Sequence, residues 1–178
     1  RQLYKQLDIG TAKPKFDEEI SKGVHKLDGI YHYLYDFVDP KENFNLFDYQ
    51  KEVKKVLKRA DGVPILVGGT GLYIDSIVFN YHLIERNIQT KKNLRAKNIS
   101  ELQEIAKEYL SEMNASDRKN KHRLIRAIQR GGVNSKKGEA MDNKYFVLDI
   151  PKEQLEERVK KRMDEMFKIG LLEENISL

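Results

Sequence analysis

The chain contains no cysteine and no tryptophan among its 178 residues, and only four prolines. Without cysteine it forms neither a disulfide framework nor a thiolate metal site, and we expect a reducing compartment, the cytoplasm. No apolar run approaches the roughly 20 residues that a helix needs to cross a membrane. The mixture of 39% hydrophobic and 34% charged residues predicts a globular core under a heavily solvated surface.

The charge is more informative in its placement than in its sum. The net charge of +5 and the pI near 9.2 indicate a polyanionic partner only weakly, because many basic proteins bind nothing anionic. The four histidines show none of the spacings typical of metal ligands. We therefore predict no metal site within this sequence.

Hydrophobic periodicity predicts helices and short strands in alternation. Apolar residues recur at helical spacing over 46–60, and a continuously apolar run follows at 63–67. A second such run, 145–150, leads into a helix over 152–168 that Gly170 ends. Short continuous apolar strands that alternate with helices favour an α/β fold with a parallel sheet.

The polar stretch 81–133 interrupts this alternation. It carries two helical patterns, and the second runs from about Ser116, a plausible N-cap, to Arg130. We predict a helical insertion at 81–133, with residues 1–80 as the first part of the α/β core and residues 134–178 as the return to it.

A glycine-rich turn, GGTG, follows the apolar run at 63–67. Glycines after a strand let the backbone approach a phosphate, and the hydroxyl of Thr70 is a further donor. A tight turn with Thr70 as a helix N-cap explains the same residues. No lysine follows at the place that a Walker motif requires, so a nucleotide-binding P-loop is excluded here.

The second helix of the insertion predicts a concentrated cationic face. At about 100° per residue one narrow arc holds Lys119, Arg123, Arg126 and Arg130. The opposite side holds Leu124, Ile125 and Ile128. A stripe without acids at i±4 favours phosphate binding, and a solvated surface helix is the alternative.

Arg162 lies close to the apolar side of the helix over 152–168, near Leu155 and Val159. An arginine in that position needs an anionic partner or a water-filled cleft. Two readings remain open: a guanidinium that clamps a substrate phosphate, or an internal salt bridge to an acid such as Asp8 or Asp36.

Several motifs together identify a family. They are RQLYKQLDIGTAKP at 1–14, GIYHYLYDFVDPKENFNLFDYQ at 29–50, VPILVGGTGLYI at 63–74, SDRKNKHRLIRAI at 116–128 and LEERVKKRMDEMFKIGLLEE at 155–174. In this order, over nearly the whole chain, they closely resemble the bacterial tRNA dimethylallyltransferases, also called tRNA isopentenyltransferases.

The resemblance implies a P-loop NTPase-like α/β core with a small helical insertion. It implies that a dimethylallyl group passes from dimethylallyl diphosphate to the exocyclic amine of the adenine just after the anticodon of a tRNA. The partners would be tRNA and dimethylallyl diphosphate, with Mg²⁺ as cofactor and no membrane. We expect a monomer.

The resemblance also assigns residues. Those expected at the diphosphate are Gly68, Gly69, Thr70 and Arg162, with Thr70 as the catalytic contact to the leaving oxygen. Those expected at the tRNA are Arg1, Gln2, Thr11, Lys13, Thr70, Lys92, His122, Arg123, Leu124, Ile125 and Arg126.

The sequence departs from the family pattern in three places. The family's phosphate-binding loop, with its magnesium ligand, and its general-base aspartate would precede Arg1, and a C-terminal tRNA-contacting segment would follow Leu178. Gln129 stands where a glutamate is usual. We expect a fragment, inactive by itself. The alternatives are an adenylate isopentenyltransferase of the cytokinin type and a non-catalytic RNA-binding remnant.

Overall fold

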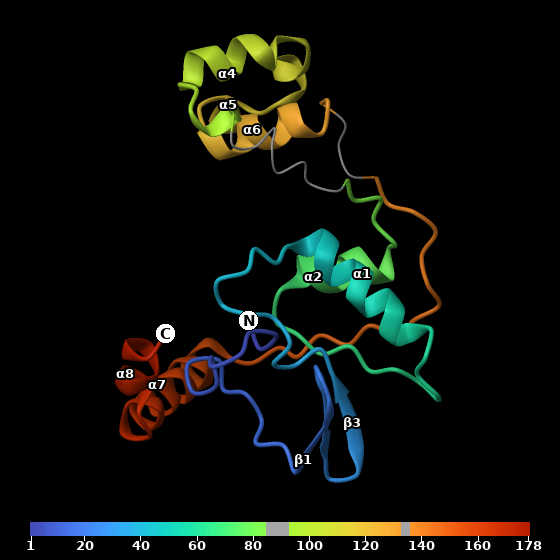
Figure 1. Ribbon diagram of the computed structural model, residues 1–178, viewed down its shortest axis with the longest axis vertical. Helices are drawn as coiled ribbons and strands as arrows, with labels where there is room; N and C mark the ends of the chain where they lie inside the picture. The colour runs from blue at the N-terminus through green and yellow to red at the C-terminus, as the bar shows by residue number, and fades with distance from the viewer. Residues whose placement is uncertain (85–92, 133–135) are drawn as a thin grey trace. The chain divides into compact units, whose positions relative to one another are not determined.

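The computed structural model describes residues 1–84, 93–132 and 136–178 (Figure 1). The chain divides into two compact units: Arg1–Gly68 together with Asp142–Leu178, and Gly69–Met141. The division differs from the predicted boundaries at 80 and 133.

The helix α2, Gly71–Val78, belongs to the second unit rather than to the α/β core. Backbone hydrogen bonds explain this, because the returning chain docks on the end of α2. The N–H of Gly138 donates to the carbonyl of Phe79 at 3.0 Å, and that of Met141 donates to the carbonyl of Val78 at 2.9 Å.

The first unit combines a small antiparallel sheet with three helices. Its described elements are β1 (Glu18–Ser21), β2 (Val24–Leu27), β3 (Ile30–Tyr33), α1 (Leu46–Leu57), α7 (Lys152–Lys168) and α8 (Leu171–Ile176). The strand order is β1-β2-β3, and both pairs are antiparallel. The predicted helices at 46–60 and 152–168 are confirmed, the second with its bounds unchanged.

A tight hairpin joins β2 to β3 through Asp28 and Gly29. Both residues have positive φ, 50° and 80°, as a type I′ turn requires, and Asp-Gly is a favoured pair for that turn. One face of the sheet is covered by Phe16, whose ring stacks on His25 at 4.5 Å and meets Tyr35 edge-on at 4.9 Å. This sheet was not predicted from the sequence.

The two apolar runs predicted as parallel strands, 63–67 and 145–150, form no strand among the described residues. Ile65 is 86% exposed and Leu148 91% exposed. A continuously apolar strand is stable only where neighbouring strands satisfy its backbone groups and cover its faces. Neither run has a ladder partner in the described parts of the chain, so the described residues do not form the predicted parallel sheet.

The second unit is helical. Its described elements are α2, α4 (Ile99–Ile105), the 3₁₀ helix η1 (Lys107–Glu112), α5 (Ala115–Arg118) and α6 (Lys121–Gln129). Its core consists of Leu94, Leu102, Ala106, Leu124 and Ile125. The helix predicted from Ser116 to Arg130 is therefore two helices, because Asn120 caps α6 by accepting the N–H of Arg123.

Candidate functional site

The turn of Gly68, Gly69 and Thr70 enters α2. Thr70 occupies the N-cap position with extended backbone angles, φ −102° and ψ 97°, yet its hydroxyl makes no capping hydrogen bond. A Cβ added to Gly69 or Gly71 would meet nothing within 4 Å. Internal packing therefore does not require these glycines, and the exposed turn leaves both its backbone and its hydroxyl accessible to an anion.

Arg162 lies on an exposed face of α7, contrary to the expectation that it points toward a buried side. Its apolar neighbours Leu155 and Val159 are 48% and 52% exposed, since only Met166 of α7 is buried. Among the described residues Arg162 makes no salt bridge, and Asp8 and Asp36 pair with a lysine instead. The internal salt bridge to either acid is thereby excluded in this structure.

That lysine is Lys13, which was predicted to lie near the tRNA. Its side chain is 3% exposed, and its ammonium donates to Asp8 Oδ1 at 2.5 Å, to Asp36 Oδ1 and to the carbonyl of Tyr4 at 2.9 Å. An ammonium has three N–H donors, so all are used. In this structure Lys13 holds the segment 1–14 together and offers no donor to a phosphate.

Two further predicted residues stabilise the same segment. The side-chain amide of Gln2 donates to the carbonyls of Thr11 and Ala12 at 3.1 and 3.2 Å. The hydroxyl of Thr11 donates to the carbonyl of Leu7 at 2.5 Å. Arg1 is exposed at the start of the segment. Gln2, Thr11 and Lys13 are thus brought together, whereas Arg162 contacts none of them among the described residues.

Glu174 of α8 also belongs to this cluster, although it was not predicted from the sequence. Its carboxylate accepts the backbone N–H groups of Asp8, Ile9 and Gly10 at 2.8, 2.6 and 2.9 Å. Figure 1 shows α8 beside the first loop of the chain. The residues are more than 160 positions apart in the sequence, so no local pattern could have indicated the contact.

The hydrogen bonds to Glu174 predict a stability that depends on acidity. Burial raises the pKa of this carboxyl, but the three N–H donors and Lys13 outweigh it and hold the pKa below its ordinary value of 4.5. A depressed carboxyl pKa stabilises the fold fully above the unfolded pKa and ceases to do so as the pH falls through the folded one. We expect the melting temperatures of wild type and Glu174→Gln to differ at pH 7 and to converge below pH 4.5.

The control for this prediction is Glu173→Gln, which removes a neighbouring carboxylate that accepts none of these backbone N–H groups. Thermal unfolding followed by circular dichroism over a pH series measures all three proteins. A constant difference between wild type and Glu174→Gln down to pH 2 would contradict the assigned role of the Glu174 carboxylate.

The predicted tRNA-contacting segment of α6 divides into a buried and an exposed side. Leu124 is 0% and Ile125 4% exposed, so both side chains pack in the core and cannot contact RNA. The prediction that these two residues contact the tRNA is therefore corrected. An amphipathic helix buries its apolar face in the core and exposes its polar face to solvent. His122, Arg123 and Arg126 are on the exposed side.

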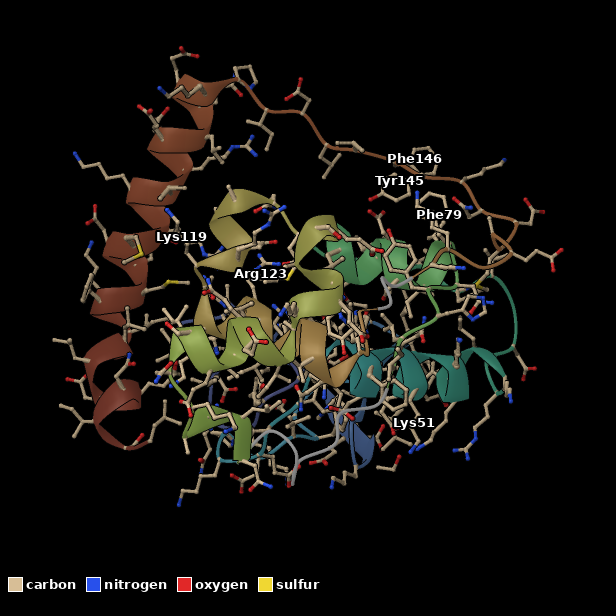
Figure 2. All side chains as sticks on the ribbon, turned by 90° about the horizontal axis from the view of Figure 1, so that it is seen from above. Lys51, Phe79, Lys119, Arg123, Tyr145 and Phe146 are labelled. Atoms are coloured by element: carbon tan, nitrogen blue, oxygen red, sulfur yellow. The ribbon has the colours of Figure 1, made fainter. Side chains whose placement is uncertain are left out.

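The cationic face is shorter than predicted. Lys119 is the C-cap of α5 and is separated from α6 by Asn120, so it does not share a helix with Arg123 (Figure 2). Arg123 approaches Asp117 at 3.8 Å, an exposed pair that contributes little stability and leaves the guanidinium accessible. Lys92, also predicted at the tRNA, lies outside the described residues.

The described residues show neither a metal-binding cluster nor a membrane-spanning helix. They hold no group of three or more histidine or acidic side chains placed to bind a metal ion. None of their helices combines the length and hydrophobicity that crossing a membrane requires.

Comparisons with known proteins identify the family. A family model described as IPP transferase matches residues 2–178, and the chain belongs to this family. The tRNA dimethylallyltransferase 2 of Treponema denticola is 34% identical over 194 residues, which is all of this chain and 62% of that protein. The tRNA dimethylallyltransferase of Aster yellows witches'-broom phytoplasma is 32% identical over 97% of this chain and 59% of its own length.

A solved structure agrees with these relatives. The crystal structure of a tRNA delta(2)-isopentenylpyrophosphate transferase from Staphylococcus epidermidis matches with a TM-score of 0.58 and 30% identity, over 97% of this chain and 60% of that one. The chain thus spans about three fifths of the length of its relatives.

Proposed function

We propose that this chain acts as the larger part of a tRNA dimethylallyltransferase. The observation that supports this most directly is its similarity, along nearly its whole length, to proteins that bear that name. In the proposed reaction the carbon–oxygen bond of dimethylallyl diphosphate breaks and diphosphate leaves. A carbon–nitrogen bond forms to the exocyclic amine of adenine, and the amine proton passes to a base that no described residue is assigned to be.

Thr70 and the neighbouring backbone N–H groups are proposed to bind the diphosphate as negative charge grows on its leaving oxygen. Donors held ready for a developing charge stabilise a transition state most when they need no reorganisation. Support comes from the accessible hydroxyl of Thr70 and from glycines that packing does not require. Arg162 is proposed as a second diphosphate ligand, since its guanidinium has no partner among the described residues.

A P-loop-type core and Mg²⁺ are part of the proposal but are assigned to no residue here. The described residues hold no carboxylate cluster that fits a metal ion, and their one sheet is antiparallel. Mg²⁺, when bound, would neutralise charge on the diphosphate. The monomeric state and the cytoplasm stay predictions.

The acceptor test compares tRNA with AMP. We expect the protein from the complete gene to transfer a labelled dimethylallyl group to a tRNA with adenine after its anticodon, and not to AMP. The exposed arginines of α6, Arg123 and Arg126, favour a macromolecular acceptor, because a free nucleotide needs no such surface. His122 is exposed beside them. Transfer to AMP alone would establish the adenylate enzyme instead, and binding without transfer would establish an RNA-binding remnant.

The cations of α6 give a prediction of their own. If Arg123 and Arg126 each contact one phosphate, their joint replacement by alanine should reduce the slope of log K against log salt by about two, since each lost contact removes about one. tRNA binding measured by filter retention between low and high salt gives the slope. Lys107→Ala on η1, paired with Glu104 in the same unit, is the control, and a slope unchanged by the double replacement would make α6 an ordinary solvated helix.

A further inference from the structure

Three successive backbone N–H groups converge on one side chain in the first unit. Oε2 of Glu174 accepts from Asp8 and Ile9, and Oε1 accepts from Gly10. Consecutive N–H groups that surround an anion form a nest, a backbone arrangement that elsewhere binds phosphate. Here the anion is supplied by the chain itself, and the bonds are charge-assisted.

The backbone nest at residues 8–10 sets the positions of the residues that follow it in the chain. Asp8 accepts from the ammonium of Lys13, and the hydroxyl of Thr11 donates to Leu7. The position of Thr11 and Lys13 therefore depends on the backbone of the loop 8–10. Glu174 fixes that backbone from outside the segment, whereas Gln2 holds the next residues, Thr11 and Ala12, from within it.

The backbone at Gly10 lies close to the side chains of α8. A Cβ at this position would lie 3.2 Å from Cδ1 of Leu171 and 3.3 Å from Oε1 of Glu174. Both distances are shorter than most Cβ contacts, so an added side chain would require the Leu171 side chain and the Glu174 carboxylate to shift by a few tenths of an ångström. Glycine at this place preserves the bonds from the loop to Glu174.

We propose that Glu174 is a positioning residue for the acceptor side of the transferase: its carboxylate holds the loop 8–10 and thereby sets the backbone of the segment 1–14, which is proposed to meet the tRNA. This inference rests on the proposed function. Glu174 itself touches no substrate. Two of its three bonds are exposed and one is partly buried, so losing them should lower the melting temperature only modestly and should act mainly on the loop.

The experiment compares Glu174→Gln with Glu173→Gln in the protein from the complete gene. Loss of the carboxylate should raise the KM for tRNA about tenfold, since small displacements of positioning groups are costly in this way. The KM for dimethylallyl diphosphate should stay the same, as should both constants of Glu173→Gln. Amide hydrogen exchange at Ile9 and Gly10 should speed up in Glu174→Gln alone.

Gly10→Ala tests the same contact between the loop and Glu174 by changing the loop instead of the carboxylate. It should also raise the KM for tRNA, and its effect should not add to that of Glu174→Gln, because both break the same contact. A wild-type KM for tRNA in Glu174→Gln, or equal changes in both KM values, would overturn the positioning role while leaving the proposed function intact. A wild-type protein that modifies no tRNA would overturn the proposed function, and this inference with it.

Discussion

Replacing Thr70 with alanine is expected to lower kcat for prenyl transfer by about 100- to 1,000-fold, the usual cost of removing one donor to a developing negative charge. The hydroxyl is proposed to act mainly in the transition state, when the leaving oxygen gains charge. The KM for dimethylallyl diphosphate should therefore change less than kcat. Single-turnover transfer of a labelled prenyl group measures the chemical step directly.

The structure makes this replacement easy to interpret. Thr70 is exposed and its hydroxyl makes no capping bond, so its loss should change the free energy of unfolding by no more than about 0.5 kcal/mol. Thr70→Ser keeps the hydroxyl and should retain most of the activity. Equal losses in the serine and alanine variants would show that the methyl group or the backbone matters, and the hydroxyl would lose its assigned role.

Replacing Arg162 with alanine should act on binding. Hydrogen bonds to charged groups contribute about 1.5–3 kcal/mol, so we expect the KM for dimethylallyl diphosphate to rise about 10- to 100-fold. Lysine at this position should restore only part of the affinity, because a point charge lacks the planar fork that holds two phosphate oxygens. Initial rates at saturating tRNA measure the effect.

Arg158 is the matched control, because it lies one turn earlier on the same exposed helix. Arg158→Ala removes the same charge and should leave the KM for dimethylallyl diphosphate near the wild-type value. If both replacements raised that KM equally, the effect would come from the general positive field of α7, and Arg162 would have no specific contact.

Local signals predicted the helices of the first unit well. α7 begins at Lys152 and ends at Lys168, as the apolar spacing and Gly170 had indicated. The hairpin was missed although its signal was present: Asp28-Gly29 between two short runs is typical of a type I′ turn. The break between α5 and α6 at Asn120 was not predicted, because the apolar residues keep a helical spacing across it and gave no sign that Asn120 caps a new helix.

Contacts between distant segments could not be predicted at all. The apolar runs at 63–67 and 145–150 were predicted to be strands from their composition. A strand forms only where a neighbouring strand pairs with it, and composition does not indicate which segment that would be. The resemblance placed Lys13 near the RNA, and no local pattern indicated that Asp8, Asp36 and Tyr4 use its three donors in this structure. The buried side of α6 was predicted correctly from periodicity, which contradicted the resemblance at Leu124 and Ile125.

The bonds between Glu174 and the loop at Asp8 have a consequence for the order in which the chain matures during synthesis. The residues that form these bonds are 164 to 166 positions apart, so the first loop cannot bond to Glu174 until α8 has left the ribosome. The helical unit between them closes through nearer contacts, and it is free to form earlier. A nascent chain that stops before α8 should therefore resist proteases across the helices while it is still cleaved in the loop.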